Sequence, residues 1–141
     1  MKVIILNGSP KAKGNTATAL REVEKVLNQQ GIETEFIHVG NKDIRGCIAC
    51  NGCWKSGICA FDDIVNEISA KMKDADGLLV GSPVYFASPN GTLLALLDRL
   101  FYSNLHSDWT MKVGASVSIA RRAGTTTTMD ALNKYFLKTN M

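Results

Sequence analysis

VIILNGSPKAKGNT, residues 3–16, passes from an apolar run through a polar loop into a helical pattern. The run from Val3 to Leu6 is short and rich in β-branched residues, which predicts a strand covered on both faces. From Asn15 to Gln30 apolar residues recur at helical spacing, which predicts a helix ended by Gly31. A buried strand followed by a helix is the first unit of a parallel α/β fold.

The rest of the chain repeats this alternation. Further strands are predicted at 32–38, 77–81 and 113–119, with the charged residues of the first of these marking it as an edge strand. Further helices are predicted to start at Asp62 or Asp63, at Ser88 with Pro89 in the first turn, and to run from Thr126 to Leu137. Residues 1–141 are therefore expected to form a single domain, a three-layer, doubly wound parallel sheet.

The strand at 113–119 has an interior pattern, yet nothing in the sequence follows the last helix to cover its far side. A long apolar edge is an aggregation hazard. We expect that the chain either lacks a further C-terminal strand and helix or borrows this cover from another subunit.

The loop after the first strand has the composition of a phosphate site. Ligands of such sheets bind beyond the carboxyl ends of the strands, and the loop lacks the glycine patterns of nucleotide triphosphatases and dinucleotide binders. It places hydroxyl, amide, ammonium and glycine positions at a helix N-terminus, where an anion is favoured: Ser9, Lys11, Lys13, Gly14, Asn15 and Thr16. The alternative is a plain turn capped by Asn15 or Thr16.

A second loop, from Ser82 to Asn90, has the residues of a platform for a flat ligand. Pro83 stiffens it, Tyr85 and Phe86 offer aromatic faces, and Asn90 can read the edge of a ring. The alternative is that Val84 and Phe86 are core residues at a strand end.

Cysteine occurs only as Cys47, Cys50, Cys53 and Cys59, in the spacing C-x2-C-x2-C-x5-C. One loop of this kind can supply all four thiolates of a 4Fe–4S cluster. Zinc is a rival metal, although its four-cysteine sites usually combine two separated C-x2-C pairs. Two further interpretations remain: a redox-active pair of Cys50 and Cys53, or four free thiols without a metal.

Bulk composition narrows the class of protein. The net charge is +3 with no basic block, so we expect no nucleic-acid binding. The short apolar run at the N-terminus is no signal sequence and no stretch reaches membrane-spanning length, so a cytoplasmic protein without membrane contact is predicted. His38 and His106 are expected to be solvated, and Trp54 and Trp109 to anchor the core or an interface.

Four motifs together resemble the flavodoxin-like NAD(P)H-dependent FMN reductases and, within them, the iron–sulfur flavoproteins. They are Gly8-Ser9-Pro10-Lys11-x-x-Gly14-Asn15-Thr16, the cysteine motif, Gly81-Ser82-Pro83-Val84-Tyr85-Phe86, and Ala120-Arg121-Arg122-Ala123-Gly124. The resemblance implies that Ser9, Lys11, Asn15 and Thr16 hold the FMN phosphate. It also implies that residues 83–86 lie along the isoalloxazine ring, and that Ala120, Arg121 and Gly124 approach its other side. Lys11 stands where many relatives carry Arg.

The function implied by this resemblance is an FMN-dependent oxidoreductase. FMN would be reduced by NAD(P)H as co-substrate, or by a redox protein such as ferredoxin, and reoxidised by a small-molecule acceptor. Because the cofactor carries the electrons, no acid or base residue is named. The resemblance also implies that the protein assembles as a homodimer or homotetramer. The alternatives are an iron–sulfur flavoprotein that carries electrons without NAD(P)H reductase activity, and a metal-binding interaction or sensor protein without flavin.

Overall fold

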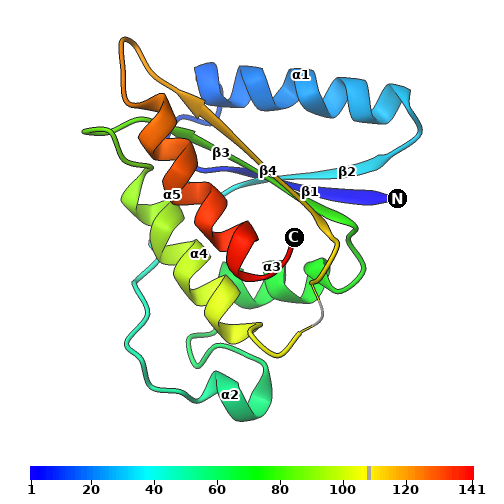
Figure 1. The fold of residues 1–141 in the computed structure, drawn as a ribbon, viewed down its shortest axis with the longest axis vertical. Helices are drawn as coiled ribbons and strands as arrows, with labels where there is room; N and C mark the ends of the chain where they lie inside the picture. Colours follow the sequence, from blue (N-terminus) through cyan, green and yellow to red (C-terminus); the bar gives the residue numbers. More distant parts are fainter. Residues whose placement is uncertain (108) are drawn as a thin grey trace.

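A four-stranded parallel sheet forms the middle layer of the molecule (Figure 1). The computed structural model describes residues 1–107 and 109–141. The strands are β1 (Lys2–Asn7), β2 (Glu33–His38), β3 (Gly77–Pro83) and β4 (Val113–Ile119), in the order β2-β1-β3-β4. Each neighbouring pair is parallel. The predicted α/β class and flavodoxin-like sheet are confirmed.

Helices cover both faces of this sheet (Figure 1). One face carries α1 (Asn15–Gln29), and the other carries α3 (Ile64–Met72), α4 (Gly91–Ser103) and α5 (Thr125–Lys138). A short helix that the sequence analysis did not predict, α2 (Cys53–Ser56), lies beyond the end of α4. The result is three layers, as expected for strands joined by helical crossovers.

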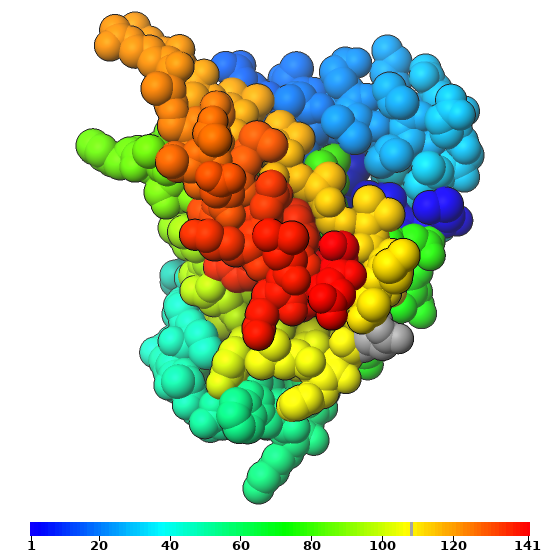
Figure 2. Space-filling model, in the orientation of Figure 1, coloured from blue at the N-terminus to red at the C-terminus, as the bar shows by residue number. Residues whose placement is uncertain are grey.

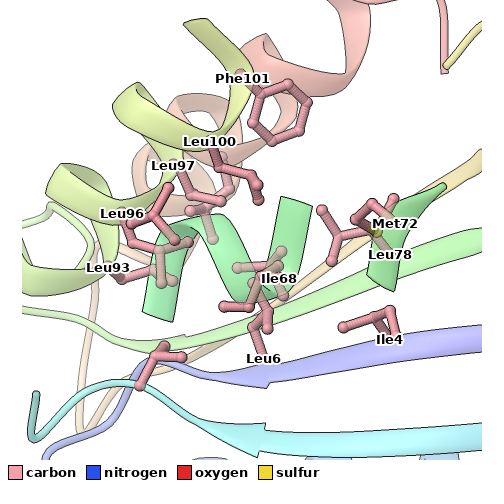
Figure 3. Packing of buried hydrophobic residues seen from close by; sticks show 14 of the residues in the cluster. Ile4, Leu6, Ile68, Met72, Leu78, Leu93, Leu96, Leu97, Leu100 and Phe101 are labelled. Atoms are coloured by element: carbon pink, nitrogen blue, oxygen red, sulfur yellow. The ribbon is translucent and has the colours of Figure 1, made fainter. Parts of the chain in front are cut away.

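The larger hydrophobic core lies between the sheet and helices α3 to α5. Ile4 and Leu6 of β1 and Leu78 of β3 point into it, toward the apolar side of α4 (Figure 3). Ile5 and Leu79 face the other way and pack against Leu20 of α1. This division follows from the strand geometry, in which successive side chains point to opposite faces.

The start of α4 differs from the prediction. The helix begins at Gly91 and is capped by Asn90, so Pro89 lies before the cap and not in the first turn. Leu96 is fully buried, whereas Leu94 is only half-buried. A helix packed between two neighbours buries a broader stripe than one row of leucines, and its centre is set by those neighbours.

The strand predicted at 113–119, for which the sequence offered no cover on the far side, is an edge strand. Within the described residues β4 pairs only with β3 and forms one edge of the sheet, with Val113 exposed. β2 forms the other edge, as predicted. The apolar stripe of α1 is also only partly covered, since Leu20 is buried but Val26 is exposed. Among the described residues, no helix is long and apolar enough to cross a membrane.

Candidate functional site

Three loops meet at the carboxyl edge of the sheet and enclose a cavity of about 450 Å³. This volume lies in the range of small-molecule and cofactor sites. Most of its lining was predicted from the sequence: Ser9, Lys11, Gly14, Asn15, Thr16, Pro83, Tyr85, Ala120 and Arg121, together with Pro10 and Ile119. The structure thus brings together nine of the predicted site residues from positions far apart in the chain.

The N-terminus of α1 opens into this cavity without a side-chain cap. Its N-cap residue is Gly14, and no side chain of the described residues caps the first turn, whereas Asp63 caps α3 and Asn90 caps α4. The expected cap by Asn15 or Thr16 is therefore wrong. Free N–H groups and the helix dipole leave this end suited to an anion.

Hydrogen bonds between residues that are close in sequence fix the conformation of the loop before α1. The N–H of Ser9 donates to Oδ1 of Asn7 at 3.0 Å, and the N–H of Lys11 donates to Oγ of Ser9 at 3.2 Å. Asn7 and Ser9 are both buried. The loop is therefore ordered by its own polar groups, while Lys11 is exposed beside the cavity and supplies positive charge.

His38 supports the same loop, which the sequence analysis missed. Its Nε2 lies 2.7 Å from the carbonyl oxygen of Ser9, so this nitrogen carries the proton and donates to the carbonyl. The expectation that His38 is simply solvated is wrong, whereas His106 is exposed as expected. The parallel pairing of Asn7 with His38 at the end of β1 and β2 explains the contact.

The second loop makes a tight two-residue turn. Tyr85 and Ser88 exchange backbone hydrogen bonds of 2.8 and 3.0 Å around Phe86 and Ala87. Both central residues are left-handed, with φ of 50° and 60°, a conformation that usually selects Asn-Gly. The Phe86 side chain is fully exposed, so the alternative of core packing is wrong for it, and Val84 is half-buried. Figure 2 shows this loop projecting from the molecule.

Five predicted residues lie outside the lining of this cavity: Lys13, Val84, Phe86, Asn90 and Gly124. Lys13 lines a neighbouring groove with Arg21 and His38. Gly124 packs against the turn, where a Cβ would approach Cα of Ala87 to 2.8 Å. Asn90 is buried and ties the loops together, so its role is in the framework of the site.

The four cysteines gather around a second, enclosed cavity of about 20 Å³, next to Arg99 and Tyr102 of α4. All four are free thiols. Cys47 and Cys50 are exposed and Cys53 is buried, and burial raises the pKa of the Cys53 thiol. Tyr102 donates from its hydroxyl to Oδ1 of Asn51 at 3.0 Å and so holds the middle of the segment against α4.

The donor set of this second cavity suits a thiolate-bound metal centre. As they stand, no three or more His, Cys, Asp or Glu side chains of the described residues are arranged to hold a metal ion. The exposed Cys47 and Cys50 lie in a segment without helix or strand. Metal binding would therefore require this segment to bring its sulfurs together, while the chemistry of the ligands fits iron–sulfur or zinc binding.

The two candidate sites lie at different ends of α4 (Figure 1). Asn90 at its start contacts the phosphate-type loop, and Arg99 near its end contacts Cys59. The two residues are roughly 13 Å apart along the axis at ~1.5 Å per residue. Trp54 is exposed beside Tyr102, whereas Trp109 is buried against Phe101 as a core anchor.

A larger cavity of about 710 Å³ lies between α4 and α5. Its lining is mostly apolar and includes Phe101, Tyr102 and Tyr135. It contains none of the residues that the sequence analysis singled out for a cofactor or a metal. We therefore assign no chemistry to it.

The comparisons with known proteins point to one family. Residues 1–141 match the family model described as NADPH-dependent FMN reductase. An iron-sulfur flavoprotein of Methanocaldococcus jannaschii is 41% identical over 139 residues, which are 97% of this chain and 72% of that protein. An iron-sulfur flavoprotein of Methanosarcina thermophila is 30% identical over 138 residues, 96% of this chain and 72% of that protein.

Solved structures of flavin proteins share the fold. RosB, solved with bound 8-demethyl-8-formylriboflavin-5'-phosphate, has a TM-score of 0.80 at 18% identity and covers 99% of this chain. An NADH:FMN oxidoreductase has a TM-score of 0.70 at 22% identity and covers 98%. The chain spans 60% of the RosB chain and 68% of the oxidoreductase chain.

Proposed function

The chain belongs to the NADPH-dependent FMN reductase family, and from this premise we propose that it is an FMN-dependent oxidoreductase. It passes electrons from NAD(P)H or a reduced carrier to a small acceptor. FMN, when bound, supplies both hydride and one-electron transfer. The protein supplies the binding site, its orientation and its charge.

The uncapped N-terminus of α1 beside Lys11 is the observation that carries this proposal. The first-turn N–H groups, the hydroxyls of Ser9 and Thr16 and the Lys11 ammonium would bind the phosphate of FMN. A dianion is favoured there because several donors and a positive charge converge on it. Lysine offers a point charge and not the bidentate contact of arginine. The backbone N–H groups would therefore contribute more of the hydrogen bonding to the phosphate.

The ring of FMN would extend from the phosphate toward the other two loops. Pro83 and Tyr85 line one side of the cavity, and Ala120 and Arg121 line another. Tyr85 offers an aromatic face, and the loop amides offer donors to the edge of the ring. These groups orient the ring and exclude water from part of it.

Titration of the flavin-free protein with FMN tests this assignment. Exchanging both Ser9 and Lys11 for alanine should weaken FMN binding by about 100-fold or more, because two hydrogen-bonding groups to a charged ligand each contribute ~1.5–3 kcal/mol. Lys25→Ala, which changes an exposed lysine of α1 away from the cavity, is the control. Unchanged affinity in the double variant would refute the placement of the phosphate.

The cysteine cavity favours a second candidate function, an iron–sulfur flavoprotein that carries electrons without NAD(P)H reductase activity. Its support is the common cavity lined by Cys47, Cys50, Cys53 and Cys59, together with relatives whose names state this class. In that case the four thiolates would ligate a 4Fe–4S cluster, which exchanges single electrons.

Two measurements separate these candidates. NADPH oxidation with added FMN and a small acceptor should proceed if the protein is a reductase, and should be absent if it is only a carrier. The visible spectrum of anaerobically purified protein should show a broad absorption that bleaches on reduction if the cluster is present. If elemental analysis finds zinc and that absorption is absent, the result would favour zinc binding by the four cysteines.

A further inference from the structure

Arg99 is a charged residue of α4 beside the cysteine segment, with only 1% of its surface exposed. All five of its N–H groups are used. Nε donates to Sγ of Cys59 at 3.2 Å. The terminal nitrogens donate to both carboxylate oxygens of Asp63, at 2.6 and 2.9 Å, and to the carbonyls of Arg45 at 3.4 Å and Phe61 at 3.1 Å.

The acceptors of Arg99 lie on both sides of the cysteine segment. Arg45 precedes the first cysteine, Phe61 follows the last, and Asp63 caps α3. Arg99 therefore binds both ends of the segment 45–63 to α4, while Tyr102 holds its middle. Partners that are 36 to 54 residues distant in the chain meet on one guanidinium group.

Cys59 is the cysteine that this arrangement fixes most firmly. Its backbone N–H donates to Oδ1 of Asn66 at 3.0 Å, and Nδ2 of Asn66 donates back to the carbonyl of Cys59 at 3.0 Å. Arg99 holds its sulfur. By contrast, Cys47 and Cys50 are exposed, in a stretch where Ala49 and Asn51 adopt positive φ.

The charge on Arg99 is retained in spite of its burial. A guanidinium is not deprotonated in proteins, and here both carboxylate oxygens of Asp63 pair with it at 2.6 and 2.9 Å. A charged N–H bound to a thiolate sulfur draws electron density away from it. Hydrogen bonds to ligand sulfurs are one of the factors that set the reduction potential of an iron–sulfur centre.

We propose that Arg99 is a positioning residue for a thiolate-ligated iron–sulfur centre, which presets Cys59 as its first sulfur ligand and raises the reduction potential of the centre through the Nε–H···Sγ hydrogen bond. This inference rests on the proposed iron–sulfur function. Asp63 is the ion-pair partner of Arg99: it orients the guanidinium and offsets its positive charge. Groups that orient a ligand in this way commonly contribute 10- to 100-fold to metal affinity.

The test uses the full chain, loaded anaerobically with ferrous iron and sulfide. Arg99→Lys keeps the positive charge but loses the paired hydrogen bonds to Asp63 and the hydrogen bond to the sulfur of Cys59. It should make reduction about tenfold less favourable, which is about 59 mV for one electron. Asp63→Asn should shift the potential in the opposite direction, since it removes a negative charge while asparagine still caps α3. Arg21→Lys, on an exposed arginine of α1 over the ring of Phe36, should match the wild type.

The opposite signs separate tuning from a purely structural role, which would change both variants in the same direction. In the metal-free protein, amide hydrogen exchange across 45–63 should be about tenfold faster in Arg99→Lys, because the segment loses its tie to α4. If Arg99→Lys does not fold, Asp63→Asn decides alone: a raised potential supports the inference, and an unchanged or lowered potential overturns it.

The possible failures are distinguishable. Wild-type protein that takes up no iron overturns the iron–sulfur function and this inference with it. Wild-type protein that takes up iron, with variant potentials and exchange equal to its own, overturns the role of Arg99 alone.

Discussion

Asn90 donates a 2.7 Å hydrogen bond from its side-chain amide to the carbonyl oxygen of Gly8, across 82 positions of the chain. Its Oδ1 accepts from the N–H of Thr92 and caps α4, and its own N–H donates to Oγ of Ser82 at 2.9 Å. One buried residue thus fixes the first and second loops of the cofactor cavity relative to each other.

Asn90→Ser should separate the two roles of this residue. Serine still caps a helix, but it cannot reach Gly8, so we expect a loss of about 1–3 kcal/mol in unfolding free energy and weaker FMN binding. Asn90→Ala should cost about 1 kcal/mol more, because the cap is lost as well. Chemical denaturation and FMN titration measure both effects. Equal stability of the serine variant and the wild type would contradict the cross-link.

Gly40→Ala should disturb the phosphate-type loop. A Cβ at Gly40 would lie 2.3 Å from the backbone carbon and oxygen of Ser9, so the backbone itself must move. We expect a cost of about 1–3 kcal/mol, as for other overpacked sites, and at least about tenfold weaker FMN binding. Gly91→Ala is the control, because a Cβ there meets nothing within 4 Å. The idea fails if both variants bind FMN alike.

Replacing Phe86-Ala87 by Asn-Gly should relax the turn of the second loop. Both positions have positive φ, which costs roughly 1–2 kcal/mol for a residue with a Cβ other than Asn or Asp. The double variant should therefore melt at a higher temperature than the wild type. If the exposed ring of Phe86 covers the flavin, FMN affinity should fall at the same time. A lower melting temperature would show that the turn is not strained.

Exchange of all four cysteines for alanine should leave FMN affinity within about twofold of the wild-type value, less than ~0.5 kcal/mol. The two cavities share no lining residue among the described residues. Equilibrium titration of FMN into the metal-free proteins is the measurement. Loss of flavin binding would mean that the cysteine segment supports the first site through contacts not seen in this structure.

Acid should weaken the attachment of β2 to α3. The Lys71 ammonium, 2.6 Å from Glu35, and then Lys2 hold the pKa of the Glu35 carboxyl below its ordinary value of 4.5. The stabilisation is therefore present above pH 4.5 and is lost as the pH falls through the lowered value. For such a partly exposed pair it amounts to about 0.5 kcal/mol or less.

Glu35→Gln should flatten the dependence of unfolding free energy on pH in this acidic range and leave it unchanged at neutral pH apart from a small constant loss. Glu22→Gln, on the exposed side of α1, serves as the control. The interpretation is wrong if the acidic slope of the Glu35 variant equals that of the wild type.

The sequence alone was sufficient for the order of elements and for most of the cofactor cavity. Strand and helix periodicity is local, and parallel strands bring their carboxyl ends to one edge, so Ser9, Pro83 and Arg121 could be expected together. Their residue types also indicated a phosphate-bearing ligand. The spacing of the cysteines likewise required no structure to suggest a common metal site.

Tertiary structure alone decided which residues hold these sites in place. Arg99 looked like any helical arginine, and His38 like a solvated strand end, until folding placed a cysteine sulfur against one and a loop carbonyl against the other. Local periodicity reports what one segment prefers, whereas a buried polar group is placed by partners that are dozens of residues away and become its neighbours only when the layers pack.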